Sequence, residues 1–173
     1  MSESIKRSGF MVFMNTAPTS TSPTYNLVGD GVTELSVDYG AQPKTEQYIN
    51  ADSATTEIVG YQPTVSVTMT AKKGDPVFEY VNALRKKRAI LSDAYTDIIL
   101  ADAYDVATAG DLTAIPAEKQ PVSIQIGSYG GPAEDPLSID YTINFRGDSV
   151  DGTFNAKTKA FTESAASAES QSE

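Results

Sequence analysis

Alternation of apolar and polar residues is the dominant pattern in this chain. It is strictest over residues 137–145, where Leu137, Ile139, Tyr141 and Ile143 are separated by single polar residues. Neighbouring side chains of a β-strand point to opposite faces, so this pattern predicts a strand with one buried face. The same alternation predicts further strands over residues 32–39, 63–72 and 122–126.

Other segments have the composition of strands without strict alternation: residues 9–16, 25–28, 94–101 and 153–161. Ile98, Ile99 and Leu100 follow one another directly, which predicts a strand buried on both faces or a central strand of a sandwich. Gly29-Asp30-Gly31 separates residues 25–28 from residues 32–39, and we interpret these two segments as a hairpin.

The apolar period changes to that of an α-helix over residues 75–88. Val77, Phe78, Val81 and Leu84 recur at helical spacing. Asp75 is a suitable N-cap, and Pro76 fits the first helical position. The basic residues 85–88 fall in the last turn, where positive charge offsets the negative end of the helix dipole. We therefore predict a helix over residues 75–88.

These elements predict a mainly β fold of about eight strands, an antiparallel β-sandwich or barrel-like sheet with one flanking α-helix. We assign residues 1–161 to a single domain. Residues 40–63 lack sustained alternation and are predicted to form one long loop that leaves the sheet, which is compatible with strand-like arms. Residues 162–173 are Ser, Ala, Glu and Gln with one Thr, and are predicted to be a disordered tail.

Composition removes most catalytic chemistry. The chain contains no cysteine and no histidine, so disulfides, thiolate nucleophiles, imidazole catalysis and Cys/His metal sites are excluded. Two close carboxylate pairs, Asp102 with Asp105 and Asp148 with Asp151, could bind calcium or act as an acid–base pair. Neither has the ligand spacing of a calcium loop, and we interpret both as turn residues. We predict no enzymatic activity, no metal site and no cofactor.

Charge is distributed unevenly along the chain. There are 13 basic and 23 acidic residues, a net charge of −10. Residues 72–88 hold six basic residues against Asp75 and Glu79, which gives +4 there and −14 elsewhere. The basic helix end could satisfy the helix dipole, bind nucleic acid or lipid, or meet an acidic surface of another copy in a heterologous contact. The acidic remainder disfavours affinity for DNA but suits the wall of a duct along which DNA slides.

No apolar run approaches the length of a bilayer span, and residues 9–13 are too short for the core of a signal peptide. We therefore expect a soluble product made in the cytoplasm, with no membrane partner. Four tyrosines fall in or beside predicted loops, where they either cover sheet edges or form an interface: Tyr25, Tyr48, Tyr61 and Tyr129.

Several short motifs follow one another along the chain. They are Tyr48-Ile49 with Asp52-Ser53-Ala54, then Thr68-Met69-Thr70-Ala71, Gly74-Asp75-Pro76-Val77-Phe78, Tyr80-Val81, Leu84-Arg85 and Ala94, and finally Ile143-Asn144-Phe145-Arg146-Gly147-Asp148 with Gly152-Thr153-Phe154. In this order and spacing they resemble the major tail tube proteins of long-tailed, siphovirus-type bacteriophages of Gram-positive bacteria, and the resemblance covers most of residues 25–161.

The resemblance implies a tail tube fold whose subunits form hexameric rings that stack into a tube, a negatively lined conduit for DNA ejection. It implies a virion location in the phage tail, and tape measure, tail-terminator and tail-tip proteins as partners. DNA would pass through the lumen without specific binding. Residues 40–63 would be the loop that reaches between stacked rings.

Site residues follow from the resemblance together with the strand pattern. Asp38 and Asp140, on the polar faces of predicted strands, are expected to face the lumen. Inter-subunit contacts are expected at Tyr48, Ile49, Asp52 and Tyr61 in the long loop and at Arg85, Lys86, Lys87 and Arg88 at the helix end. Two alternatives stay open: a β-sandwich binding module displayed on a virion or cell surface, and the inner tube of a contractile tail or related injection device.

Overall fold

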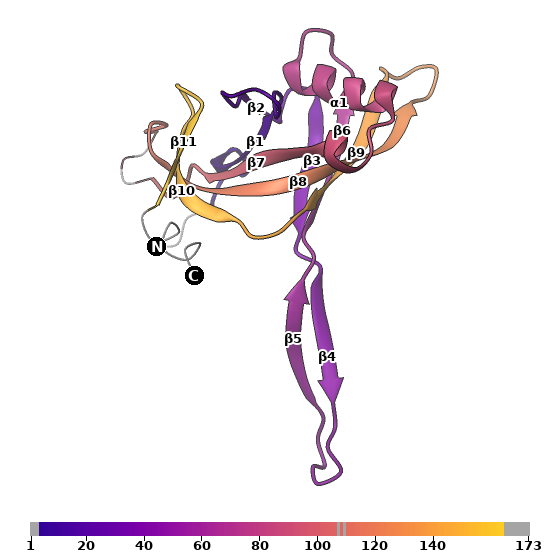
Figure 1. Cartoon of the computed structure of the whole chain (residues 1–173), viewed down its shortest axis with the longest axis vertical. Coiled ribbons are helices and arrows are strands. Elements are labelled where there is room, and N and C mark those ends of the chain that lie inside the picture. The colour runs from indigo at the N-terminus through magenta and orange to yellow at the C-terminus, as the bar shows by residue number, and fades with distance from the viewer. Residues whose placement is uncertain (1–3, 107, 109, 165–173) are drawn as a thin grey trace.

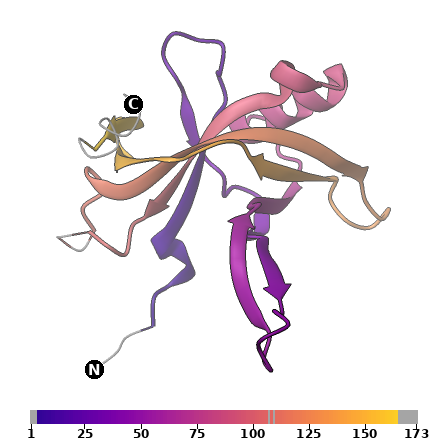
Figure 2. The same ribbon diagram turned by 60° about the horizontal axis from the view of Figure 1, so that its bottom comes forward.

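The computed structural model describes residues 4–106, 108 and 110–164. These residues form a curled sheet with an α-helix packed on it and a hairpin that projects away from it (Figures 1 and 2). The predicted mainly β fold with one flanking α-helix is therefore confirmed. No helix among the described residues is long and apolar enough to cross a bilayer.

The strands are β1 (Phe10–Asn15), β2 (Tyr25–Leu27), β3 (Val32–Asp38), β4 (Ala41–Glu46), β5 (Thr55–Tyr61), β6 (Thr64–Thr70), β7 (Tyr95–Asp102), β8 (Ile115–Gly130), β9 (Ser138–Phe145), β10 (Val150–Asn155) and β11 (Ala160–Glu163). The α-helix is α1 (Pro76–Lys87), and η1 (Arg7–Gly9) and η2 (Leu91–Ala94) are short 3₁₀ turns. Nine strands form one antiparallel sheet in the order β2-β1-β7-β8-β9-β6-β3, with β10 pairing with β8 and β11. β4 and β5 form a separate two-stranded sheet.

β8 is the longest strand and belongs to both halves of the large sheet. One edge pairs with β7 over residues 117–123, while the other edge pairs first with β10 and then with β9. The change of partner falls at Pro121, which has no N–H to donate. There the buried side-chain amide of Gln120 donates to the carbonyls of Arg146 and Gly147, both at 3.1 Å. The junction between the two half-sheets is therefore held by the Gln120 side chain together with one backbone hydrogen bond, from the Arg146 N–H to the Pro121 carbonyl at 2.9 Å.

The curl of the sheet creates two apolar cores on opposite faces of β1 and β7. The larger core lies between α1 and the inner faces of β3, β6, β8 and β9. The smaller core lies under β10 and contains Phe13 and Phe154, whose ring centroids are 4.6 Å apart. β7 gives Ile98 to the larger core and Ile99 to the smaller one, so the prediction of a strand buried on both faces is confirmed.

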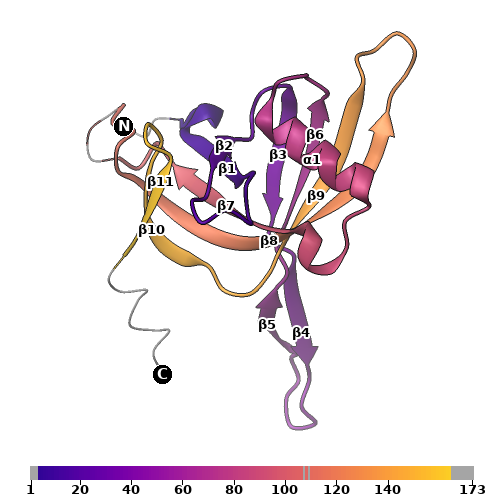
Figure 3. The same cartoon turned by 45° about the horizontal axis from the view of Figure 1, so that its top comes forward.

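The helix forms where the sequence predicts it and lies across β3, β6 and β9 (Figure 3). The Asp75 carboxylate accepts hydrogen bonds from the backbone N–H groups of Val77 (3.4 Å) and Phe78 (3.1 Å), which makes it the predicted N-cap. The helix ends at Arg88, which is in the left-handed conformation (φ 51°). Its buried face packs into the larger core.

The predicted hairpin of residues 25–28 and 32–39 is wrong. β2 pairs with β1, and β3 pairs with β6 at the opposite end of the sheet. The turn at Gly29–Gly31 thus carries the chain between the two edges of the sheet, because Tyr25 packs in the smaller core and Leu35 in the larger one.

Tyr25 is not a loop residue covering an edge, since it is 1% exposed. Its hydroxyl donates to one carboxylate oxygen of Asp97, and the other oxygen accepts from Asn15 at 3.0 Å. Burial, together with the hydrogen bond to Asp97, raises the pKa of the Tyr25 hydroxyl.

The predicted last strand, residues 153–161, is two strands, because β10 and β11 pair across a turn. The Asn155 side chain makes that turn by accepting hydrogen bonds from the N–H groups of Lys157 and Thr158, both at 3.0 Å. β11 also includes Thr162 and Glu163, the first two residues of the predicted tail. Residues 165–173 of that tail lie outside the described residues.

We expect Gln120→Leu to lower the free energy of unfolding by about 1–3 kcal/mol, because it removes the part-buried hydrogen bonds to the Arg146 and Gly147 carbonyls while keeping side-chain volume. Urea unfolding of dilute protein measures this. The matched control is Gln125→Leu, on an exposed side chain of the same strand, which should change stability by less than about 0.5 kcal/mol. Equal effects of the two substitutions would contradict a special role for the junction.

Candidate functional site

One face of the half-sheet formed by β3, β6, β9 and the second part of β8 is entirely polar. Side chains on the other face of these strands enter the larger core, so those between them point outward. We call these outward residues the polar face: Glu34, Ser36, Asp38, Thr64, Ser66, Thr68, Thr70, Ser123, Gln125, Ser138, Asp140, Thr142 and Asn144. None of them is buried, and most are small hydroxyl or amide residues.

Strand register places both predicted lumen acids on this polar face. Asp38 lies opposite Thr64, and Asp140 lies opposite Thr68, two rows along the same sheet. Glu34 also lies opposite Thr68, so a third acid shares the face. Glu34 is two residues before Ser36 and four before Asp38, so the alternation of this strand already contained the signal that places it on the same face.

The polar face is acidic and lacks cations. β3, β6, β9 and residues 122–130 of β8 contain no lysine or arginine. Two cations lie at its margins. Arg146 follows β9, and its guanidinium lies 3.4 Å from the centroid of the Tyr95 ring. The Arg7 guanidinium donates to the carbonyl of Leu35 at the β3 edge (3.1 Å). The face therefore presents negative charge on a surface of small polar groups.

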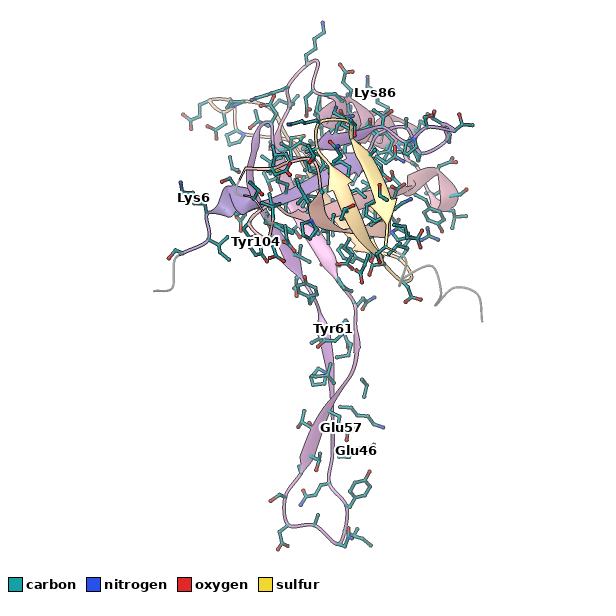
Figure 4. The ribbon with its side chains drawn as sticks, turned by 90° about the vertical axis from the view of Figure 1, so that its left-hand side faces the viewer. Lys6, Glu46, Glu57, Tyr61, Lys86 and Tyr104 are labelled. Atoms are coloured by element: carbon teal, nitrogen blue, oxygen red, sulfur yellow. The ribbon has the colours of Figure 1, made fainter. Side chains whose placement is uncertain are left out.

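The predicted long loop is a β-hairpin, β4 and β5, which we call the arm (residues 41–61). It leaves the sheet between Gly40 and Gln62, where the Gln62 N–H donates to the carbonyls of Tyr39 and Gly40, both at 3.2 Å. Figure 4 shows Tyr61, Glu57 and Glu46 spaced along it, away from the rest of the chain. The strand-like arms that its composition allows are thus present.

The arm has no core of its own. All its residues except Gly60 are exposed, including Tyr48, Ile58 and Tyr61, and Ile49 at the tip is completely exposed. Its recorded side-chain contacts are local, such as the ion pair of Lys44 with Glu46 (2.6 Å) and the hydrogen bond from the Tyr48 hydroxyl to Glu46 (3.0 Å). An isolated two-stranded hairpin is marginally stable in water, so this arm is suited to being covered by another surface.

The basic helix end, Arg85 to Arg88, lies at the opposite end of the molecule from the arm (Figures 1 and 4). Arg85 donates to the Asn82 side chain (2.9 Å) and its guanidinium lies 3.9 Å from the centroid of the Tyr129 ring. Lys86, Lys87 and Arg88 are exposed. Within the described part of the chain, none of the four cations is in an ion pair. The predicted inter-subunit residues thus form two separate sites, one at each end.

One carboxylate from each pair considered for chemistry, Asp102 and Asp151, lies on a groove of about 580 Å³ beside the arm base, together with Glu118. Burial, followed by repulsion from Asp105 and Glu118, raises the pKa of Asp102. Across residues 4–106, 108 and 110–164, no group of three acidic side chains is arranged to hold a metal ion. Asp148 lies on a neighbouring groove with Ser149 and is not brought together with Asp102.

No protein-family model matches the sequence, and neither does any curated protein. Among the solved structures that match are the following two. A chain from the tail of an empty GTA particle, computed with helical refinement and C6 symmetry, matches with a TM-score of 0.59 at 10% identity, over 86% of this chain and 98% of that chain. A chain from the PVC sheath/tube terminator, part of an extracellular contractile injection system in its extended state, matches with a TM-score of 0.50 at 11% identity, over 87% and 97%. At this identity the likeness shows a shared fold.

We expect Asp102→Asn to stabilise the dilute monomer at pH 7. The raised pKa means that the folded chain holds the Asp102 proton more tightly than the unfolded chain, so ionisation costs stability. The gain should be complete above the raised folded-state pKa and should fade as the pH falls toward the ordinary aspartate value. Urea unfolding of variant and wild type at several pH values measures the difference.

Asp111→Asn is a control of opposite sign. Hydrogen bonds from the Thr113 side chain and backbone lower the pKa of Asp111, so its ionised form stabilises the fold. This substitution should reduce stability at pH 7, and the loss should vanish as the pH falls through the lowered folded-state pKa. A gain from Asp102→Asn that did not change with pH would contradict the repulsion argument.

Proposed function

We propose that this chain is the subunit of a tail tube: a virion structural protein that assembles into rings, which stack around a bore that DNA crosses. The observation that carries the proposal is the polar face, an exposed sheet surface with Glu34, Asp38 and Asp140 and no cation. A surface of small polar and negative groups repels the phosphate backbone and offers it no ion pair, as a conduit requires. The shared fold with a chain from a GTA tail supports this role.

We further propose six subunits per ring. The C6 symmetry of the similar tail and the motif resemblance support that number. The arm and the basic helix end lie at opposite ends of the chain, so contacts between them are heterologous and propagate as a stack. In this assembly Asp38 and Asp140 face the bore, and Tyr48, Ile49, Asp52, Tyr61 and residues 85–88 make inter-subunit contacts.

The sequence motifs support a long-tailed phage of Gram-positive bacteria, and with it DNA ejection as the biological event. On this proposal the tube forms in the host cytoplasm and becomes part of the virion, in contact with tape measure, terminator and tail-tip proteins. The role is structural and non-catalytic. The similarity to a chain of a contractile injection system supports the inner tube of such a device as a second candidate.

Concentrated purified protein is expected to form rings or tubes visible by electron microscopy. The arm can be removed by joining Gly40 to Gln62, because these residues are already hydrogen-bonded at its base. The shortened chain should fold with unchanged circular dichroism outside the lost strands, yet form no long tubes. A wild-type chain that stays monomeric at every concentration and salt would overturn the proposal. Normal tubes from the shortened chain would show that the arm serves a displayed binding function instead.

Charge reversal tests which face lines the bore. Tubes of a variant with Glu34→Lys, Asp38→Lys and Asp140→Lys, assembled with short duplex DNA, should retain nuclease-protected DNA at low salt and release it at high salt. Wild-type tubes should retain none. The control carries Glu134→Lys, Asp135→Lys and Glu163→Lys, the same change in net charge at exposed acids away from the polar face. Protection by the control and not by the first variant would place a different surface in the bore.

A further inference from the structure

A partly apolar groove lies between the C-terminal end of α1, η2 and the second part of β8. Its volume is about 700 Å³, and its lining includes Leu84, Arg85, Arg88, Ile90, Leu91 and Ile126. β7 pairs with β8 only as far as Ser123, so no strand of the described chain continues along that edge of β8. We call this groove the α1–η2 groove. Its lining combines apolar side chains with cations that are in no ion pair within the described chain.

Two features of this groove are costly in an isolated chain. Ile90 and Leu91 are 72% and 75% exposed, although both are large and apolar. Leu91 also has a φ of 51°, a left-handed conformation that costs a residue with a Cβ free energy and that persists at sites with a function. This turn holds two apolar side chains in solvent, as expected of a surface that another chain covers.

The tip of the arm has the complementary chemistry. Tyr48, which is exposed although its hydroxyl donates to Glu46, and the fully exposed Ile49 supply apolar surface that the described part of their own chain leaves uncovered. The arm carries Glu46, Asp52 and Glu57 against Lys44, a net charge of −2, whereas residues 84–94 carry four cations against Asp93, a net charge of +3. Opposite charge around an apolar centre favours correct docking and disfavours alternatives.

Geometry makes the contact intermolecular. The arm tip and α1 lie at opposite ends of the molecule, as Lys86 and Glu46 show in Figure 4. With roughly 3.3 Å per strand residue, the arm reaches about 30 Å beyond the sheet. A second copy displaced along the long axis of Figure 1 would present its α1 side to that tip.

We propose that the arm tip of one copy docks in the α1–η2 groove of a second copy in the next ring of the stack. Tyr48 and Ile49 cover Ile90 and Leu91, and Asp52 lies near Arg88. This inference rests on the proposed tube function and identifies the receiving surface for the arm.

Disulfide trapping tests the pairing directly, because the chain has no cysteine of its own. Tubes of the I49C/L91C variant, assembled under reducing conditions and then oxidised, should give a ladder of linked chains on a non-reducing gel. The matched control is I49C/L27C, with its second cysteine at another exposed leucine, on β2. The control should give at most the dimers that Ile49→Cys forms alone.

Charge exchange gives an independent readout should the cysteine variant not assemble. Asp52→Lys and Arg88→Glu should each shorten tubes at least several-fold at low salt, and the double variant should recover wild-type length. Wild-type tubes without a ladder from I49C/L91C, or without recovery in the double variant, would overturn the docking site and leave the tube function standing. A wild-type chain that forms neither rings nor tubes would overturn both.

Discussion

The fold depends on one strand, β8, having two different partners along one edge. A strand that pairs with β10 and then with β9 must turn as it passes between them, and the sheet curls with it. At the junction the Gln120 amide replaces missing ladder bonds, because Pro121 cannot donate one and Arg146 and Gly147 leave carbonyls to be satisfied. β8 is therefore the strand that the two half-sheets share, and the junction fixes where its partner changes.

The curl decides what each surface can do. On one side, α1 and the inner faces of four strands share the larger core, so those faces are fully committed to packing. The outer face of the same strands is left uncovered by the elements of residues 4–106, 108 and 110–164, and its side chains are polar or acidic. This half-sheet thus separates a buried apolar core from an exposed polar surface, as the wall of a channel does. Its helix side holds it together, and its polar side is free to border water and a passing polyanion.

The arm and the turn at Ile90 and Leu91, in contrast to the polar face, expose apolar side chains to solvent. A solitary chain would gain by burying these side chains. They carry opposite net charges and lie at opposite ends of the molecule. The chain therefore exposes apolar side chains and uncompensated charge at both ends, whereas the sheet and helix between them have well-packed cores. In the proposed tube, head-to-tail association would bury both ends and so link the stability of the arm to assembly.

Local physics in the sequence determined the helix with its Asp75 cap, the alternating strands β6 and β9, the doubly buried β7, the departure of residues 40–63 from the sheet, and the polarity of Asp38 and Asp140. Each of these depends on neighbours a few residues away. Tertiary structure alone decided strand partners: Gly29-Asp30-Gly31 has the composition of a hairpin turn, yet β2 and β3 separate because their buried residues belong to different cores. It also decided that Glu34 and Asp140 both lie opposite Thr68, in one row of the sheet, and that Leu91 is held outward in a left-handed turn. The partner of a strand and the exposure of a side chain depend on residues far away in the sequence. A pattern of neighbouring residues therefore cannot determine them.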